Sequence, residues 1–350
     1  MKNTNQLILD LISKNASIDE ITTITGLSHK QLFYRMNMLK IKGYNFKKKY
    51  YYSGDIVYEL IKGLNTDNGL KNETTIITAP EDDVFRALLI SDIHLGNIKE
   101  RPDLLYEVYN FCVKKDIHII INTGDLLDGC LGKKNEKSIY DLEEQINYLL
   151  KVYPFDSKII NFICLGNHDF SIVENNGLDL HTVLENKRHD LVPLSYGRSF
   201  LNIKNDQILL KHENEVYIKG IKKNVCNLTF EGHHHISKVV KHDASTKLFV
   251  PSLSDISIGE YSQFPSMVLV NLSFMSGLFH FGNFEQFIFV NKSLFKVNEN
   301  EFHLLNGKKI SSKISNEEKR NILTERDIVE ILKKNNFQCS DDPIKKKSLI

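Results

Sequence analysis

Residues 87–96 read Ala-Leu-Leu-Ile-Ser-Asp-Ile-His-Leu-Gly, an apolar run that leads directly into a carboxylate and an imidazole. The run at 87–90 is typical of a strand that is buried on both faces. In extended chain, alternate side chains point to the same side, so Asp92 and His94 are expected to reach one metal ion together. The segment therefore predicts a pair of metal ligands at the end of a buried strand.

The same design occurs four more times along the chain. Apolar, strand-like runs are found at 117–121, 159–165, 208–212 and 228–233. The polar motifs that accompany them are GDLLD at 124–128, GNHD at 166–169, the single His212 and GHHH at 232–235. Loops beyond strand ends are where open α/β sheets bind ligands. These motifs are thus expected to meet at one edge of a sheet.

Each motif alone has a simpler interpretation. A lone histidine is more often structural than a ligand, GNHD is compatible with an Asn-containing turn, and GHHH with a solvated histidine cluster. The five motifs together, in this order, indicate a two-metal hydrolytic centre, which needs about seven such ligands from several loops. Asp125 is the candidate bridge, because a carboxylate has two oxygens and can contact two ions.

The series DxH, GDxxD, GNHD, His and GHxH resembles the calcineurin-like metallophosphoesterase superfamily over residues 85–290. The resemblance implies that His168 faces the scissile phosphate and is oriented by Asp169. It also implies that His234 points away from the centre and that Asp128 fills the second acidic position of GDxxD. The metal ligands that it implies are Asp92, His94, Asp125 and His235 for one ion, and Asp125, Asn167, His212 and His233 for the other.

The resemblance further implies a two-metal-dependent phosphoesterase in which a metal-bridging hydroxide attacks phosphorus. Nitrogen and oxygen ligands without a thiolate suit manganese, iron or zinc, and we expect manganese. The SDIHLG and GNHD segments look like the nuclease branch of the superfamily, so a phosphodiesterase or nuclease acting on DNA or RNA is the leading hypothesis. A phosphomonoesterase or protein phosphatase is the main alternative, and a non-enzymatic DNA-binding regulator is the other.

The first 53 residues are expected to form a separate winged helix-turn-helix. Ser17 and Glu20 fit a capping box that opens a helix, and Ser28 can cap a second helix after the turn at Gly26. Residues 44–52 are expected to form a short hairpin. A solvated basic face on a small protein-interaction module is the alternative interpretation.

Charge supports nucleic-acid binding by this module, with DNA preferred over RNA. Between residues 27 and 53 there are seven Lys or Arg side chains and no Asp or Glu. Such donors suit phosphates and base edges, and neighbouring aromatics suit unstacked bases. The predicted contacts are Lys30, Gln31, Tyr34, Arg35, Lys47, Lys48 and Lys49.

Composition fits an ordinary globular chain with a net charge of +1 and a hydrophobic fraction of 41%. Five cysteines without a CxxC pair, no secretory leader and no long apolar run predict a cytoplasmic protein without a membrane span. No long coiled coil is evident, so the sequence does not indicate a partner ATPase, and it leaves the oligomeric state open.

The predicted fold class is α/β, a two-sheet αββα metallophosphoesterase sandwich preceded by the small helical domain. The predicted division is a winged helix-turn-helix at 1–53, a linker at 54–80, the catalytic domain at 81–298, and a C-terminal extension with a helix and a polar tail at 299–350.

Overall fold

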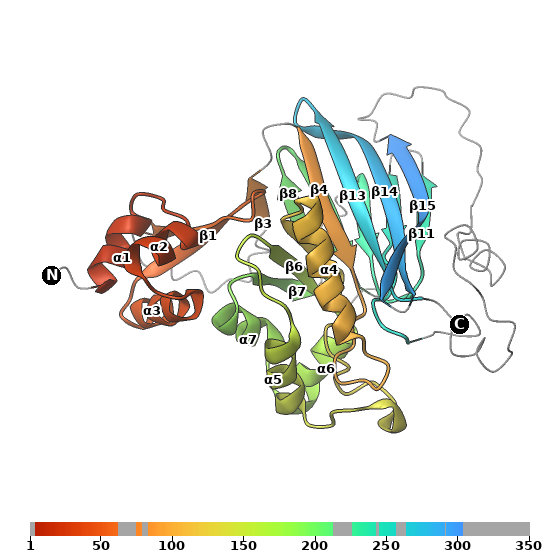
Figure 1. Cartoon of the computed structure of the whole chain (residues 1–350), viewed down its shortest axis with the longest axis horizontal. Coiled ribbons are helices and arrows are strands. Elements are labelled where there is room, and N and C mark those ends of the chain that lie inside the picture. The colour runs from red at the N-terminus through yellow and green to blue at the C-terminus, as the bar shows by residue number, and fades with distance from the viewer. Residues whose placement is uncertain are drawn as a thin grey trace, which may run out of the picture.

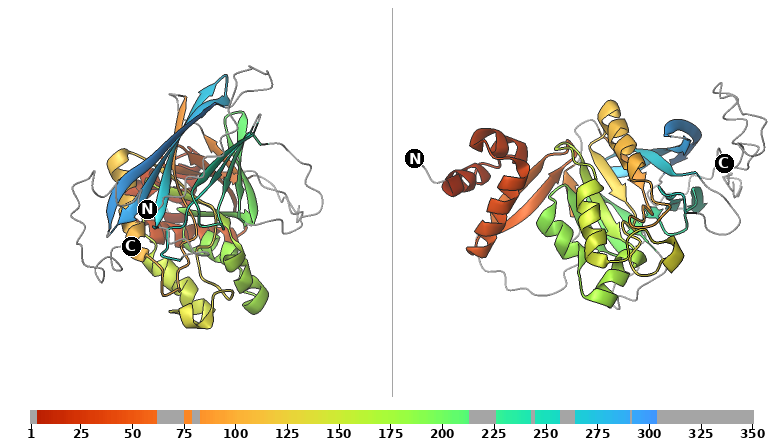
Figure 2. Two further views of the ribbon diagram at one scale, coloured as in Figure 1. Left: turned by 90° about the vertical axis from the view of Figure 1, so that its right-hand side faces the viewer. Right: turned by 60° about the horizontal axis from the view of Figure 1, so that its bottom comes forward.

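A computed structural model describes residues 4–61, 75–78, 83–212, 226–242, 245–256, 264–290 and 292–303 of the 350-residue chain. Its body consists of two β-sheets that face each other, with helices on one outer side, and a small helical module projects from one end (Figures 1 and 2). The predicted α/β two-sheet sandwich is therefore confirmed. The helix predicted within the C-terminal extension falls outside the described residues.

The first sheet has seven strands and contains the first three predicted apolar runs. β4, β5, β6 and β7 are parallel to one another, while β13, β14 and β15 continue the sheet antiparallel beyond β4. In spatial order its strands are β15 (Ser293–His303), β14 (Leu278–Val290), β13 (Ser266–Met275), β4 (Val84–Ile90), β5 (Ile119–Asn122), β6 (Ile160–Leu165) and β7 (Leu191–Tyr196).

The second sheet has eight strands and contains the runs that precede His212 and His233. β9, β10 and β12 are parallel neighbours. In spatial order its strands are β11 (Lys238–His242), β12 (Ser245–Phe249), β10 (Leu228–Glu231), β9 (Asp206–Lys211), β8 (Arg198–Ile203), β3 (Thr75–Thr78), β1 (Asn45–Tyr51) and β2 (Ile56–Ile61).

The parallel strands β4, β5 and β6 of the seven-stranded sheet are buried on both faces because each face covers a different core. Leu89 and Ile121 face the second sheet and share a core with Leu210, whereas Leu88 and Ile120 belong to a core with the helices. Alternate residues of one strand point to opposite faces, which produces this division. The helices beside this sheet are α4 (Pro102–Lys115), α5 (Leu142–Val152), α6 (Asn167–Asn176) and α7 (Leu180–Lys187), and a short 3-10 helix, η1 (Lys134–Glu136), precedes α5.

One expectation about topology was wrong. The sequence also has strand-like runs at 247–254, 267–272, 287–290 and 294–297, which were expected to complete the second sheet. The first run contributes to β12 and does join that sheet, but β13, β14 and β15 extend the first one. β13 lies beside β4 through six paired residues. Strand order depends on long-range pairing, and the alternation of apolar residues along a strand does not specify which sheet the strand joins.

The described part of the N-terminal module has three helices, α1 (Thr4–Ile12), α2 (Ile18–Thr25) and α3 (His29–Ile41), and the last two begin at the predicted caps. Ser17 forms the predicted capping box with Glu20, and Ser28 forms one with Gln31. Each box satisfies backbone N–H groups that the first turn of a helix leaves without partners. Gly26 ends α2 in the left-handed conformation.

The hairpin and the linker after α3 differ from the prediction. Residues 44–52 are not a hairpin, because β1 occupies them as one strand and pairs with β2 in the predicted linker at 54–80. β3, also within that linker, pairs with β1 on one side and β8 on the other. The hairpin that β1 and β2 form is consequently part of the eight-stranded sheet, and the predicted domain boundary at residue 53 falls within this hairpin. β15 likewise runs across the predicted boundary at 298.

Side chains of the hairpin also enter the core of the body. Tyr50 packs edge-on against Phe162 with ring centroids 5.2 Å apart, and the Tyr52 hydroxyl accepts a hydrogen bond of 2.9 Å from the Arg86 backbone N–H. Buried residues of α1, α3 and β2 belong to the same cluster as the core between the sheets. Cutting the chain after residue 52 would therefore remove part of that core. Among the described residues, no helix is long and apolar enough to cross a membrane.

Gly54 turns the chain between β1 and β2 and provides a test of this docking. Its φ is 82°, and an added Cβ would lie 1.9 Å from the backbone carbonyl oxygen of Lys158. At Gly26, with φ 70°, nothing lies within 4 Å of such a Cβ. Gly26→Ala is expected to cost about 1 kcal/mol of unfolding free energy from backbone strain alone. Gly54→Ala should cost ~1–3 kcal/mol more, because it also overpacks a contact. Equal costs in urea unfolding would contradict the docked arrangement.

Candidate metal centre

The predicted ligands lie in loops at the ends of parallel strands from both sheets. β4, β5 and β6 are parallel neighbours in one sheet, and β9 and β10 are parallel neighbours in the other. The carboxyl ends of parallel strands meet at one edge, so the loops that leave them converge. In chain order these loops carry Asp92 and His94, then Asp125, Asn167, His212, and His233 with His235.

Asp92, His94 and His235 form the first group of acceptors. His235 Nε2 lies 3.3 Å from Asp92 Oδ1 and 3.3 Å from His94 Nε2. His94 Nε2 is 3.9 Å from Asp92 Oδ1. All three side chains are buried. The structure thus brings His235 beside Asp92, although the two residues are 143 positions apart in the chain.

The backbone at Asp92 and His94 is not extended as predicted. Their φ values are 52° and 50°, in the left-handed region. After β4 the chain runs beside the next motif, and the N–H groups of Asp92 and Ile93 donate to the carbonyls of Gly124 and Asp125. This pairing, rather than an extended strand, directs both side chains to the same point.

Asp125, Asn167, His212 and His233 form the second group. His212 Nε2 lies 3.0 Å from Asp125 Oδ2 and 3.1 Å from Asn167 Oδ1. The rings of His212 and His233 are 5.3 Å apart between centroids. Asp125, His212 and His233 can each offer one ligand atom within 4.8 Å of the others.

One oxygen of Asp125 faces both groups. Asp125 Oδ2 is 3.0 Å from His212 Nε2 and 3.8 Å from His94 Nε2. The other oxygen, Oδ1, accepts a 2.9 Å hydrogen bond from the His168 backbone N–H. Asp125 is 1% exposed, so water does not screen its charge. It occupies the position between the groups that a bridging ligand requires.

The ligand atoms of the two groups suit divalent ions, because they are hydrogen-bond acceptors that face one another. His212 Nδ1 lies 2.6 Å from the Thr123 carbonyl, and His235 Nδ1 lies 3.1 Å from the Ile256 carbonyl. Each Nδ1 carries the proton in these contacts, so Nε2 is the ring nitrogen that would offer a lone pair to a bound cation. Asp92 Oδ1 is buried without a hydrogen-bond donor. A cation between such acceptors would resolve their mutual repulsion.

The ionisation of these side chains reflects the same demand for positive charge. Burial by itself would lower the pKa of His212, but the adjacent Asp125 carboxylate raises it to about 10. Burial would raise the pKa of Asp92, yet His235 beside it lowers that pKa to about 2. Burial lowers the pKa of His94 to about 4. The carboxylates are therefore ionised at neutral pH, and the ring of His94 is neutral.

Backbone strain concentrates at the ligands. A non-glycine residue with positive φ costs of order 1–3 kcal/mol and persists where the surroundings enforce it. The glycine before Asn167 has a related purpose, because a Cβ on Gly166 would lie 2.1 Å from Asp125 Oδ1. The predicted ligands with φ between 50° and 71° are Asp92, His94, Asp125, His233 and His235.

The predicted partner of His168 was wrong. Asp169 does not contact the His168 ring; its carboxylate accepts the backbone N–H groups of Gly166, Leu126 and Leu127. Asp169 is fully buried, and burial raises its pKa to about 6. It thus ties the GNHD loop to the GDLLD loop. This role needs no histidine, because unpaired backbone donors are sufficient partners.

The Asp128 backbone carbonyl orients His168 instead. His168 Nδ1 lies 2.7 Å from this oxygen, which leaves Nε2 as the other ring nitrogen. The Asp128 carboxylate accepts from Asn97 Nδ2 and Lys137 Nζ, both at 2.9 Å. Neither Asn97 nor Lys137 belongs to a motif that sequence analysis could identify. Lys137 was concealed in a lysine-rich loop, and only the fold places it against a buried carboxylate.

His234, between two predicted ligands, lies away from both groups, as expected. Its Nε2 is 3.2 Å from Glu231 Oε1, and its side chain is 38% exposed. The ring packs edge-on against Phe249 with centroids 5.2 Å apart.

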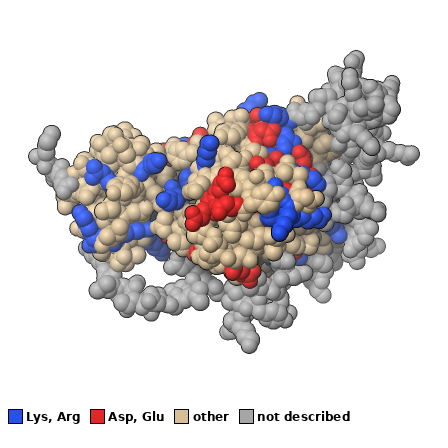
Figure 3. All heavy atoms as spheres, turned by 90° about the horizontal axis from the view of Figure 1, so that it is seen from below, with Lys and Arg blue, Asp and Glu red and all other residues tan. Residues whose placement is uncertain are grey.

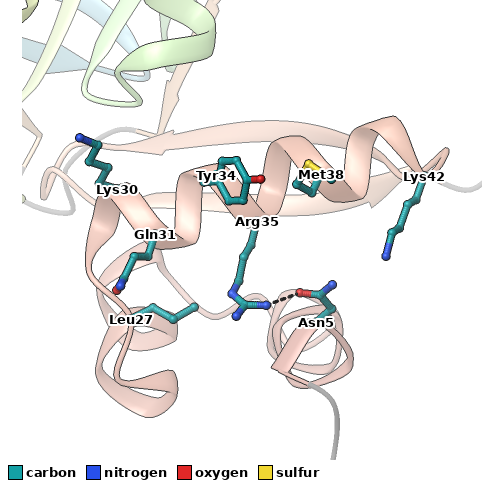
Figure 4. Close-up of a pocket in the computed structure, with 8 residues that line it drawn as sticks. All are labelled: Asn5, Leu27, Lys30, Gln31, Tyr34, Arg35, Met38 and Lys42. Atoms are coloured by element: carbon teal, nitrogen blue, oxygen red, sulfur yellow. Dashed lines mark hydrogen bonds between the residues drawn. The ribbon is translucent and has the colours of Figure 1, made fainter.

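Four of the predicted nucleic-acid contacts lie together on the N-terminal module. Lys30, Gln31, Tyr34 and Arg35 line one groove along α3 (Figure 4). Arg35 Nη1 donates to Asn5 Oδ1 of α1 at 2.9 Å across it. The rest of the lining is Asn5, Leu27, Met38 and Lys42.

The lysines of β1 behave differently from one another. Lys47 is exposed. Lys48 is partly buried, and burial lowers its pKa to about 8 despite the charge of Glu185. Lys49 forms an ion pair of 3.1 Å with Glu59 of β2. Lys48 is partly buried and Lys49 is paired with a partly exposed carboxylate, and the contacts of these lysines with nucleic acid stay predictions. Lys49 meets Glu59 because β1 pairs with β2, and the sequence did not reveal that pairing.

Comparison with protein families matches residues 85–257 to the calcineurin-like phosphoesterases. Those residues are a calcineurin-like phosphoesterase domain. The protein is therefore a metal-dependent phosphoester hydrolase, and the groups of acceptors described above are the candidate metal ligands of this domain. The match begins after the N-terminal module, whose resemblance to a winged helix-turn-helix stays a prediction. A comparison with curated proteins found no match.

Several solved structures are similar to the domain. Vacuolar protein sorting 29 from Cryptosporidium parvum is 14% identical with a TM-score of 0.38, covering 62% of this chain and 97% of that one. Vps29 from Entamoeba histolytica, solved with zinc, is 15% identical with a TM-score of 0.36, covering 63% and 99%. Nuclease MPE from Pseudomonas putida is 13% identical with a TM-score of 0.33, covering 60% and 86%.

His234 provides a matched control for the first group of ligands. His235→Ala is expected to lower the bound manganese by about one ion per chain, because it removes one of the facing acceptors. His234→Ala should leave the metal content unchanged, because that ring contacts Glu231 instead. Elemental analysis of the two variants after dialysis measures the difference. An equal loss in both would contradict the assignment of His235.

Proposed function

We propose that the domain binds two divalent ions and hydrolyses phosphodiester bonds in nucleic acid, with DNA preferred over RNA. The observation that carries the metal assignment is the position of Asp125 Oδ2, which faces His212 at 3.0 Å and His94 at 3.8 Å. Asp92, His94 and His235 would hold one ion with Asp125. Asn167, His212 and His233 would hold the other with the same carboxylate.

Manganese is the proposed metal, with iron or zinc as alternatives. The facing atoms are imidazole nitrogens, carboxylate oxygens and one amide oxygen, without a thiolate. Such mixed ligands suit these three metals better than calcium. When bound, the ions would activate water and neutralise charge on the phosphoryl group.

His168 would act on the substrate. With Nδ1 directed at the Asp128 carbonyl, Nε2 is the nitrogen that would meet a phosphoryl or leaving-group oxygen. Protonated there, it would donate a hydrogen bond to the phosphate and pass a proton to the departing alkoxide. Lys137 and Asn97 hold Asp128, so they position the carbonyl on which this orientation depends.

The charge of the N-terminal module supports nucleic acid as the substrate class. Figure 3 views the molecule from the side on which α3 lies in Figure 1, and Lys and Arg side chains are spread over the module in this view. The groove along α3 is lined by Lys30, Arg35 and Lys42 and by no carboxylate. Several cations in one groove can bind a phosphate backbone and displace its counterions.

Substrate preference tests the proposal directly. The full chain with added manganese is expected to hydrolyse bis-(p-nitrophenyl) phosphate faster than p-nitrophenyl phosphate, and to cleave labelled DNA. Asp125→Ala should abolish all of these activities, because it removes the ligand shared by both ions. Hydrolysis of the monoester alone would instead assign the protein to the phosphomonoesterases or protein phosphatases.

His168→Ala separates catalysis from metal binding. The variant is expected to keep its manganese and to lose about 10²–10⁴-fold in kcat, the usual contribution of a general acid. The loss should be largest for substrates with poor leaving groups, because these depend most on protonation. Steady-state kinetics beside elemental analysis measures both properties. Full activity in a variant that retains metal would remove His168 from the mechanism.

A further inference from the structure

The groove along α3 is concave, and the flanks of α3 are covered. On one flank, His29 Nδ1 lies 3.3 Å from His189 Nε2 and Asn37 Nδ2 donates to the Asn186 carbonyl at 3.3 Å. On the other flank, Arg35 is bonded to Asn5 of α1 (Figure 4). A recognition helix must project into the major groove of a duplex, which is about 12 Å wide. With the catalytic domain and α1 beside it, α3 does not project in that way.

The lining of the groove suits exposed bases as well as phosphates. Tyr34 is 66% exposed, and the apolar side chains of Leu27 and Met38 line the same groove. Lys30 and Lys42 lie toward opposite ends of α3 in the same groove. An aromatic platform between cations is the arrangement that binds an unpaired strand, because bases stack on the ring while cations follow the backbone. In a duplex the faces of the bases are already stacked on one another.

The two side-chain amide oxygens of the groove already accept hydrogen bonds. Asn5 Oδ1 accepts from Arg35, and Gln31 Oε1 accepts the Ser28 backbone N–H at 2.9 Å. Proteins distinguish RNA by contacts to its 2′-hydroxyl, which is a donor as well as an acceptor. Both amide oxygens already accept one hydrogen bond and no carboxylate lines the groove, so the lining offers a 2′-hydroxyl few side-chain acceptors beside the Tyr34 hydroxyl.

We propose that this groove binds single-stranded DNA. The inference rests on the proposed function and makes its substrate more specific, since the bound segment would be unpaired. β1 joins the module to the body through β3 and β8, so the groove has a fixed place relative to the metal centre.

The test is binding by the full-length chain in EDTA, which prevents hydrolysis. Fluorescence anisotropy would compare a labelled 20-nucleotide single strand of mixed sequence, the matching duplex and the same sequence as RNA. Single-stranded DNA should bind at least about tenfold more tightly than the duplex, and no more weakly than RNA. Tyr34→Ala should weaken single-strand binding about tenfold, the loss expected for one stacked base.

Lys14 is the control for charge. It is exposed on the same module but does not line the groove. Lys30→Glu is expected to weaken binding to the single strand, while Lys14→Glu, with the same change in net charge, should have little effect. Lys30→Ala should also reduce the slope of log K against log salt by about 0.7, as expected for one lost phosphate contact.

Three results would overturn the proposal. They are tighter binding of the duplex or of RNA, unchanged binding by Tyr34→Ala with native circular dichroism, and equal losses in Lys14→Glu and Lys30→Glu. Hydrolysis of bis-(p-nitrophenyl) phosphate by the wild-type chain is measured separately. Binding without hydrolysis would reject the catalytic proposal and support the groove, and hydrolysis without single-strand binding would do the reverse.

Discussion

Buried acceptor atoms that face one another around Asp125 are the constraint on which the rest of this structure depends. Its carboxylate points between two groups of ligands, and the nearest ring nitrogens lie 3.0 Å and 3.8 Å from one oxygen. Such an arrangement is unfavourable unless positive charge is supplied, because burial removes the water that would screen it. The pKa of His212 reflects this need for positive charge, because the adjacent Asp125 carboxylate raises it to about 10.

The fold serves this constraint in two ways. Parallel strands in both sheets end at one edge, which brings the ligand loops together from distant parts of the chain. Contacts behind the ligands then fix their directions: backbone carbonyls bind the Nδ1 atoms of His212 and His235, and Asp169 ties two loops together. Several residues at the centre have strained, left-handed backbone conformations, and this surrounding network holds them in place. The N-terminal module is joined to the eight-stranded sheet through β1, and it adds a basic groove along α3.

The sequence predicted what depends on local chemistry and missed what depends on distant contacts. The capping box at Ser17, the cap at Ser28 and the strands before the ligand motifs follow from neighbouring residues and were correct. The sheet that β13 joins, and the partner of β1, depend on pairing between remote segments. The same holds within the site. Asp169 and Lys137 are polar residues whose partners are a backbone and a buried carboxylate, and only the fold brings these together. Lys48 was predicted to contact nucleic acid, but the structure shows that it is partly buried.

The central claim is that these acceptors hold two ions bridged by Asp125. The most direct measurement is diffraction from crystals soaked in manganese chloride, with data collected at the manganese absorption edge. The account predicts two anomalous peaks about 3.5–4 Å apart, one on each side of the Asp125 carboxylate. A single peak, or peaks that do not contact Asp125, would contradict it.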